Sequence, residues 1–209
     1  MKTPDLIHLL ARDGMQDRSP DPTLMLVPAL AVVAMMVGTI LGFRADLSSA
    51  VLNPLMSVRF VLFAALGVVA LRTALQLAQP GSEGPVPVRM LGLVAVAALI
   101  LVALALATTP VDGWQMAATG KTIMICLIAI PLLSILPVVV IFNALHRGAS
   151  VRPGLSGAMA GLAGSGMAAT VYSLHCTEDS PLFYVTWYGL AILLVTVTSA
   201  VIGSRVLRW

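Results

Sequence analysis

The most informative shortage in this chain of 209 residues is charge: Asp, Glu, Lys and Arg together make up 10% of it. A soluble globular domain carries about 25% of these residues. Hydrophobic residues reach 59%, and the mean hydropathy is +0.99. These values indicate a protein whose main solvent is lipid. The net charge of +3 is spread along the chain without a basic cluster, so we expect no direct binding of nucleic acid.

Reactive side chains are equally scarce, with two cysteines and three histidines. Two cysteines cannot build a disulfide framework, and their spacing is neither a zinc-finger nor a CxxC pattern. The sequence has no HExxH motif and no cofactor fingerprint, and no Asp or Glu lies within the long apolar runs. We therefore predict that the chain is not an enzyme, holds no resident cofactor and is not an ion-coupled carrier.

Long apolar runs dominate the remainder of the chain. Each is close to the roughly 20 residues that a helix needs to cross a bilayer, and helices satisfy their own backbone hydrogen bonds in lipid. We predict an all-α polytopic membrane protein, a six-transmembrane-helix bundle over residues 24–209 that follows a segment of residues 1–23. The predicted spans are Leu24–Phe43, Ser57–Ala78, Met90–Thr108, Thr122–Leu145, Leu155–Leu174 and Tyr184–Ser204.

The distribution of lysine and arginine predicts the orientation of this bundle. With six spans, nine of these residues fall on the side of the termini and three on the opposite side. Positive charge marks the cytoplasmic side, so we expect both termini in the cytoplasm. The three on the outer side are Arg44, Arg59 and Lys121. Within the spans, Arg72 looks the most buried and has no acidic partner, and an aromatic belt is expected from Trp114, Phe183, Tyr184, Trp187 and Tyr188.

Residues 1–23 form the one sizeable polar segment, and they contain a short amphipathic pattern. Leu6, Ile7, Leu9 and Leu10 share one helical face. A single short helix cannot bury these side chains by itself. It either rests on the lipid surface or docks a soluble partner, and the residues leave both interpretations open.

The fifth apolar run is rich in glycine. Gly157 and Gly161 form a GxxxG step, and Ala160 with Gly164 extends a ridge of small residues. Such a ridge allows helix backbones to approach closely. We predict that it serves packing inside the bundle.

Cys126 and Cys176 are predicted to lie at similar depth near the outer surface, on different helices, with His175 beside the second. Thiols in an oxidising compartment can close a disulfide. Two thiolates and an imidazole could instead hold a thiophilic metal ion transiently, and a protonated His175 would lower the pKa of its neighbour. Simple packing of two small apolar side chains is the remaining alternative.

Several segments of the chain carry a family resemblance. They are residues 6–11, 42–47 and 152–153, the LHCTE stretch at 174–178, Trp187, residues 205–209 and, in the fourth span, Cys126. Through these segments the chain resembles, nearly end to end, the NrsF-type family of bacterial membrane anti-sigma factors.

The resemblance implies an inner-membrane protein that sequesters an extracytoplasmic-function (ECF) sigma factor on its cytoplasmic side. The partner would bind the N-terminal segment through Leu6, Ile7, Leu9 and Leu10. Metal or oxidative stress sensed by Cys126 and Cys176, helped by His175, would release it. Signalling would shift the last three helices against the others. The competing hypothesis is a small-molecule permease or membrane scaffold without a soluble partner.

Overall fold

The computed structural model describes residues 22–47, 54–78, 86–148 and 150–208. The described residues contain helices and no strand. The elements are α2 (Pro22–Met36), η1 (Val37–Leu41, a π-helical turn), α4 (Pro54–Leu77), α5 (Val86–Thr108), η2 (Val111–Gly113), α6 (Trp114–Thr119), α7 (Ile123–His146), α8 (Pro153–Tyr172) and α9 (Pro181–Val206). Each of the six predicted apolar runs therefore forms a long helix, which confirms the all-α prediction. The predicted docking residues Leu6, Ile7, Leu9 and Leu10 lie outside the described residues.

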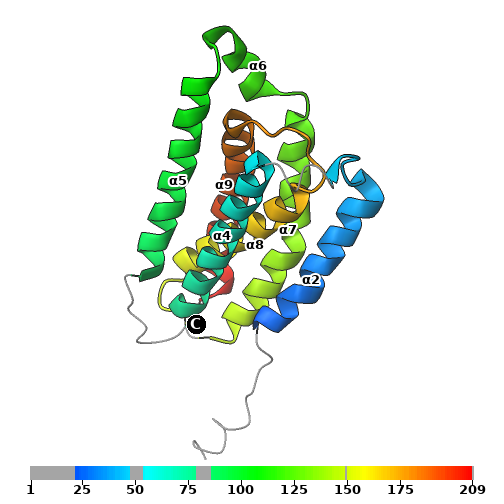
Figure 1. Cartoon of the computed structure of the whole chain (residues 1–209). Helices are drawn as coiled ribbons and strands as arrows, with labels where there is room; N and C mark the ends of the chain where they lie inside the picture. The colour runs from blue at the N-terminus through cyan, green and yellow to red at the C-terminus, as the bar shows by residue number, and fades with distance from the viewer. Residues whose placement is uncertain (1–21, 48–53, 79–85, 149, 209) are drawn as a thin grey trace, which may run out of the picture.

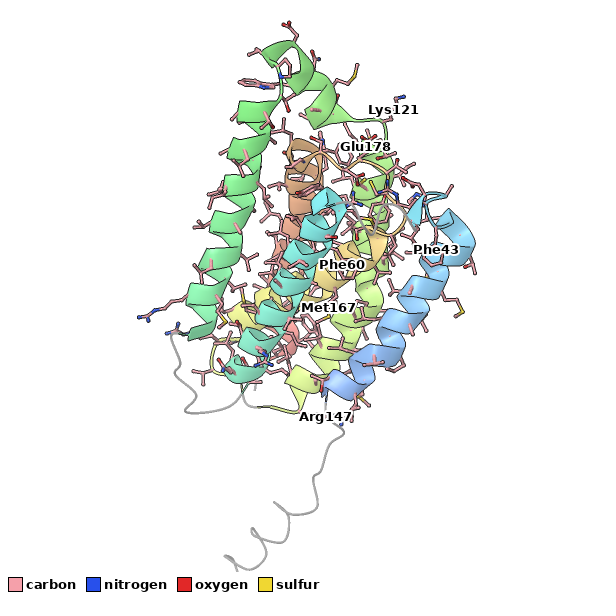
Figure 2. All side chains as sticks on the ribbon, viewed as in Figure 1. Phe43, Phe60, Lys121, Arg147, Met167 and Glu178 are labelled. Atoms are coloured by element: carbon pink, nitrogen blue, oxygen red, sulfur yellow. The ribbon has the colours of Figure 1, made fainter. Side chains whose placement is uncertain are left out.

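The long helices stand side by side with alternating direction (Figure 1). One end of the bundle holds residues 42–47, α6 and the loop 173–180, and we call it the cysteine end. The opposite end, where α2 begins and α9 finishes, is the terminal end. In Figure 2, Lys121 and Glu178 mark the cysteine end and Arg147 marks the terminal end. The loops expected on a common side thus do share one end.

By length and apolarity, five of the described helices could cross a membrane. They are α4, α5, α7, α9 and the continuous helical segment made by α2 and η1. The sixth, α8, falls short because glycine and serine dilute its hydrophobic residues. Most of α8 is also buried against α4, α7 and α9, so it needs less lipid-facing apolar surface. A sixth span remains a prediction, and it is supported by the course of α8 from the terminal end to the cysteine end (Figure 1).

Glycines on three sides of α8 allow three neighbouring helices to approach its backbone. A Cβ added at Gly157 would collide with the Ser199 carbonyl and Gly203 of α9. One added at Gly164 would lie 2.9 Å from the backbone nitrogen of Val138 in α7. The predicted packing ridge is therefore real, and it serves more than one interface.

A third close approach joins α8 to α4. A Cβ at Gly166 would lie 2.9 Å from the backbone nitrogen of Gly67. Helices that touch along their backbones gain van der Waals contact that larger side chains would prevent. Around this centre, α2 packs on α7 and α8, while α5 leans on α4 and α9.

Two expectations about individual side chains were wrong. Phe183, Tyr184 and Tyr188 do not form a lipid-facing belt, because all three are fully buried. Phe63 packs against both tyrosines, with ring centroids 6.1 Å from Tyr184 and 5.2 Å from Tyr188. The face of α9 that carries these residues is turned toward α4 and α8. Their aromatic rings fill the space that the small side chains of α8 leave. Only Trp114 and Trp187 of the predicted belt keep partial exposure.

The second error concerns the buried cation. Arg72 is exposed, whereas Arg59 of the same helix is completely buried. Both arginines interrupt an apolar run, so hydropathy alone does not separate them. The difference arises because Arg59 lies at the cysteine end, where the carbonyl groups of loop 173–180 receive it.

We expect Gly157→Ala to destabilise the bundle by about 1–3 kcal/mol, the usual cost of overpacking a tight core. The added methyl has no room between α8 and α9. Thermal unfolding of the full chain in detergent, followed by circular dichroism, measures the effect. Gly92→Ala is the matched control, because nothing lies within 4 Å of a Cβ at Gly92. Equal melting temperatures for the two variants would contradict the packing role.

Candidate functional site

The two cysteines come together although fifty residues separate them in the sequence. Cys126 lies in the first turn of α7, and Cys176 lies in the loop between α8 and α9. Both are free thiols, exposed by 0% and 2% respectively. The Thr122 hydroxyl lies within hydrogen-bonding distance of both sulfurs. The predicted pairing is therefore present in the fold, as a buried pair and not as a surface pair.

Hydroxyl groups surround this thiol pair. Thr122 Oγ1 lies 3.8 Å from Cys126 Sγ and 3.9 Å from Cys176 Sγ, so one hydroxyl contacts both sulfurs. Tyr172, at the end of α8, places its hydroxyl 3.3 Å from Cys126 Sγ. The pair thus has polar partners from α8 and from the residue that precedes α7. The buried Tyr172 hydroxyl needs a hydrogen-bond partner, and the Cys126 sulfur provides one.

The adjacent Cys126 thiol lowers the pKa of Cys176 below its ordinary value, since it stabilises the Cys176 thiolate. Burial opposes this effect, and the positive charge of Arg59 assists it. A thiolate is the nucleophilic and metal-binding form of cysteine. Cys176 is therefore the sulfur of the pair that we expect to react first.

His175 is adjacent to Cys176 in sequence but faces the turn after η1. Its Nδ1 lies 2.7 Å from the Gly42 carbonyl oxygen and donates to it, because a carbonyl can only accept. Its ring lies 5.7 Å from that of Tyr172. Within the described ranges, no group of three or more His, Cys, Asp or Glu could hold a metal ion. A metal site of Cys126, Cys176 and His175 would thus require rearrangement, and the sensing role of His175 stays a prediction.

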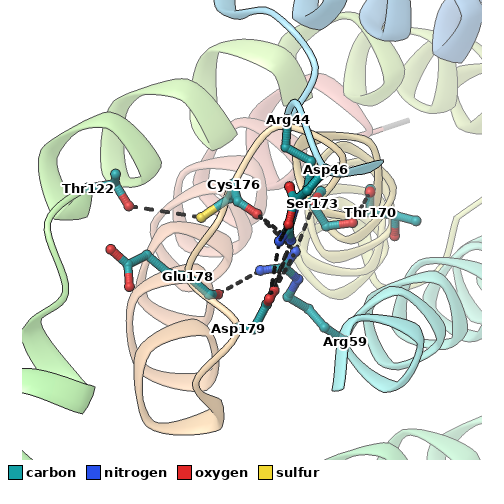
Figure 3. A network of polar contacts seen from close by, with 9 residues as sticks. All are labelled: Arg44, Asp46, Arg59, Thr122, Thr170, Ser173, Cys176, Glu178 and Asp179. Atoms are coloured by element: carbon teal, nitrogen blue, oxygen red, sulfur yellow. Dashed lines mark hydrogen bonds and ion pairs between the residues drawn. The ribbon is translucent and has the colours of Figure 1, made fainter. Parts of the chain in front are cut away.

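Arg59 of α4 binds the backbone of loop 173–180, which we call the cysteine loop (Figure 3). Its Nη1 donates to the Glu178 carbonyl at 2.7 Å. Its Nη2 donates to the carbonyls of Ser173 at 2.9 Å and Cys176 at 3.1 Å. Nη2 also lies 3.4 Å from the Asp179 carboxylate. A positive charge at the end of α8 suits the negative end of the helix dipole.

A second arginine reaches the same loop from the other side. Arg44 follows η1 and donates through Nη1 to Asp179 at 3.1 Å and to the Cys176 carbonyl at 3.4 Å. Its Nε and Nη2 form a two-pronged contact with Asp46 at 2.7 and 2.8 Å. The Arg44 guanidinium consequently holds the pKa of the exposed Asp46 carboxyl below its usual range. Arg44 and Arg59 thus share one carboxylate and one carbonyl (Figure 3).

Loop 173–180 and the first turns of α9 also bind the segment that leads into α7. The Lys121 backbone N–H donates to Glu178 Oε1 at 2.9 Å, and the Trp187 indole donates to the Ala118 carbonyl at 2.8 Å. Gly120 between them has φ +50, a left-handed conformation that glycine adopts without strain. These contacts hold the start of α7, and with it Cys126, against the cysteine loop.

Comparison with known proteins decides the family. The family model described as "NrsF: Negative regulator of sigma F" matches residues 15–209. This chain belongs to the NrsF family. The expected resemblance is therefore confirmed, and the family role is regulatory, with a sigma factor as the regulated partner.

Two curated NrsF relatives align with the chain over its whole length and over theirs. The anti-sigma-F factor NrsF of Caulobacter vibrioides is 31% identical over 218 residues. The probable anti-sigma-F factor NrsF of Azospira oryzae is 29% identical over 218 residues. No solved structure matches the chain.

Sequence reasoning found the thiol pair but missed the groups that hold it. Thr122, Tyr172, Arg44, Arg59 and Asp179 all act through contacts between distant segments. The sequence did contain a signal for Arg59, which is the third residue of a predicted span. An arginine in this position can form a buried ion pair with an acidic residue of a polar loop elsewhere in the chain. Nothing local distinguishes Thr122 or Tyr172 from other residues near helix ends.

Arg59→Met should destabilise the bundle by about 3–5 kcal/mol, the range for breaking a buried ion pair. The change leaves three carbonyls and the Asp179 carboxylate without their buried cation. Thermal unfolding of the full chain in detergent checks this expectation. Arg72→Met, an exposed arginine of the same helix, is the control and should melt within a few degrees of wild type. Similar losses in both variants would argue against a specific role for Arg59.

Cys126→Ala should raise the pKa of Cys176 from its lowered value toward the ordinary thiol value of roughly 8.5. The substitution removes the neighbouring thiol that stabilises the Cys176 thiolate, so this thiolate would form only at higher pH. Ultraviolet absorbance of the thiolate, followed against pH in the full chain, measures the midpoint. Cys176→Ala should abolish the titration step at the lower pH. An unchanged midpoint in Cys126→Ala would refute this cause.

Proposed function

We propose that the chain is a membrane-embedded anti-sigma factor of the bacterial inner membrane that sequesters an ECF sigma factor. In this proposal the cysteine end faces the periplasm, and the terminal end faces the cytoplasm. The observation that carries it is the buried thiol pair, assembled from two separate segments at the end of the bundle opposite to the start of α2. Family membership supports a sigma factor as the partner.

The orientation is supported by charge. In the predicted six-span topology, nine of the 12 lysines and arginines belong to the side of the termini, and three belong to the other side. Two of those three, Arg44 and Arg59, are engaged with loop 173–180 and are largely buried. Little free positive charge is therefore left at the cysteine end, which favours its placement outside the cytoplasm.

The N-terminal segment is the proposed docking element for the sigma factor. Leu6, Ile7, Leu9 and Leu10 provide an apolar face that a short helix cannot bury alone, and helix-in-groove binding suits such a face. The described structure begins at the terminal end, so a segment of 21 residues is attached on the side assigned to the cytoplasm.

The signal in this proposal is a change in bonding at Cys126 and Cys176. An oxidant that accepts two electrons would convert the two thiols to one disulfide: two S–H bonds break, one S–S bond forms, and two protons and two electrons pass to the oxidant. A thiophilic metal ion would instead displace the thiol protons and bind both sulfurs. Since both thiols are buried, either agent must be small or must act on a transient opening of loop 173–180.

The proposal is tested by purifying the full chain from membranes of its own host and identifying bound sigma factors by mass spectrometry. We expect an ECF sigma factor with the wild-type chain and its loss after treatment with the thiol oxidant diamide. The Cys126→Ser/Cys176→Ser double variant should keep the sigma factor after diamide, because no disulfide can form. Cadmium chloride, applied in parallel, tests metal capture by the same pair.

Deletion of residues 1–17 serves as the control for docking. This variant should insert in the membrane but bind no sigma factor before or after treatment. A permease or scaffold predicts instead that no sigma factor is retained by any variant. Release from the double serine variant equal to that from wild type would disprove the sensing role while leaving the anti-sigma role standing.

A further inference from the structure

Loop 173–180, which carries Cys176, touches the turn 42–46 at several points. The Arg44 backbone N–H donates to the Leu174 carbonyl at 3.2 Å. His175 Nδ1 donates to the Gly42 carbonyl at 2.7 Å. The Arg44 guanidinium donates to the Cys176 carbonyl and to Asp179. The turn therefore contacts residues on both sides of Cys176 as well as Cys176 itself.

The turn 42–46 is continuous with α2 through η1. Gly42 has φ +79, and its N–H donates to the Val37 carbonyl at 2.9 Å, which closes the π-helical turn. Arg44 is then fixed by its two-pronged contact with Asp46. A side chain held in this way transmits a displacement of its partner to its own backbone, because it has little freedom to absorb the movement.

The Cys176 carbonyl accepts hydrogen bonds from two arginines on different segments, α4 and the turn that follows η1. Arg59 approaches from α4 at 3.1 Å, and Arg44 approaches from the turn after α2 and η1 at 3.4 Å. The thiol and the carbonyl belong to the same residue. Any change of the Cys176 backbone that accompanies bonding to Cys126 therefore acts on both arginines at once.

The two receiving segments are packed in different ways. α4 meets α8 backbone to backbone at Gly67 and Gly166. α2 packs on α7 and α8, with Val33 and Val37 buried, and no glycine of α2 or η1 makes such a backbone contact with another helix. Since side chains can change rotamer while touching backbones cannot, we expect a displacement at the Cys176 carbonyl to be taken up by α2.

We propose that Arg44 and the turn 42–46 form the coupling element that passes the state of the Cys126–Cys176 pair to α2. This inference rests on the proposed sensing role of the two thiols. It names the first segment of the bundle as the output, in place of the last three helices that the sequence suggested. Arg44 is a positioning residue in this scheme, because it touches the Cys176 backbone and not the reacting sulfurs.

The consequence follows from chain order. α2 is the first described helix and directly continues the N-terminal segment of residues 1–21. A shift of α2 along or about its axis therefore moves the point where that segment is attached. The segment α2 alone would thus link one end of the bundle to the other. This coupling requires that α2 has two discrete positions, and it does not require a relay of side chains through the bundle.

The test uses the purified full chain in lipid nanodiscs, with hydrogen exchange measured by mass spectrometry before and after diamide. Disulfide formation is counted in the same samples from the loss of two hydrogens and of thiol reactivity. In the wild type we expect a disulfide and altered exchange in peptides that cover residues 22–47. In Arg44→Gln we expect the same disulfide but no altered exchange in those peptides.

Arg72→Gln is the matched control, since Arg72 is an exposed arginine remote from the turn, and it should behave as wild type. If Arg44→Gln does not fold, His175→Phe provides a second variant. It removes the bond to Gly42 but keeps an aromatic ring beside Tyr172, and it should reduce the exchange response.

The outcomes separate the two proposals. A disulfide that forms in the wild type without any change in residues 22–47 would overturn the coupling inference alone. The same would follow if Arg44→Gln and the wild type changed equally. Failure of the wild type to form a disulfide would overturn the redox role of the thiol pair, and with it the inference.

Discussion

The structure depends on one buried cation. Arg59 is fully buried in α4, where an unpaired charge would be very costly, and its guanidinium is accepted by three carbonyls of loop 173–180 and by Asp179. The loop folds over the end of α4 and supplies the partners of Nη1 and Nη2, while the buried Nε has no partner among the described residues. The contacts between Arg59 and the loop fix the position of Cys176 along the bundle and place its sulfur near Cys126.

A second constraint is the lack of side-chain bulk in α8. Glycines on three sides permit α4, α7 and α9 to gather around this helix at backbone distance. The loop that Arg59 anchors is the direct continuation of α8, so the central helix and the cysteine loop are positioned together. The aromatic rings of Phe63, Tyr172, Tyr184 and Tyr188 then fill the wider space near the cysteine end.

Chemistry and architecture are joined at a single residue. The side chain of Cys176 belongs to a thiol pair with a lowered pKa on one of its sulfurs, while its carbonyl belongs to the arginine network. A residue that is reactive on one side and mechanically held on the other is suited to convert a bonding change into a backbone change. In the function that we propose, this conversion would serve the regulation of a sigma factor, which is the role of the NrsF family.

The sequence by itself determined the helical class, the six long apolar segments and the small-residue ridge, and it identified the two thiols as the candidate reactive groups. These features depend on composition and on periods of a few residues, which the chain displays locally. Tertiary structure decided which arginine is buried, where the tyrosines of α9 point, how His175 is engaged and which segments hold the thiols. Arg59 and Arg72 look alike in an apolar run, and only the loop that folds over one of them gives it partners. Such contacts join residues more than a hundred positions apart, so no local pattern records them.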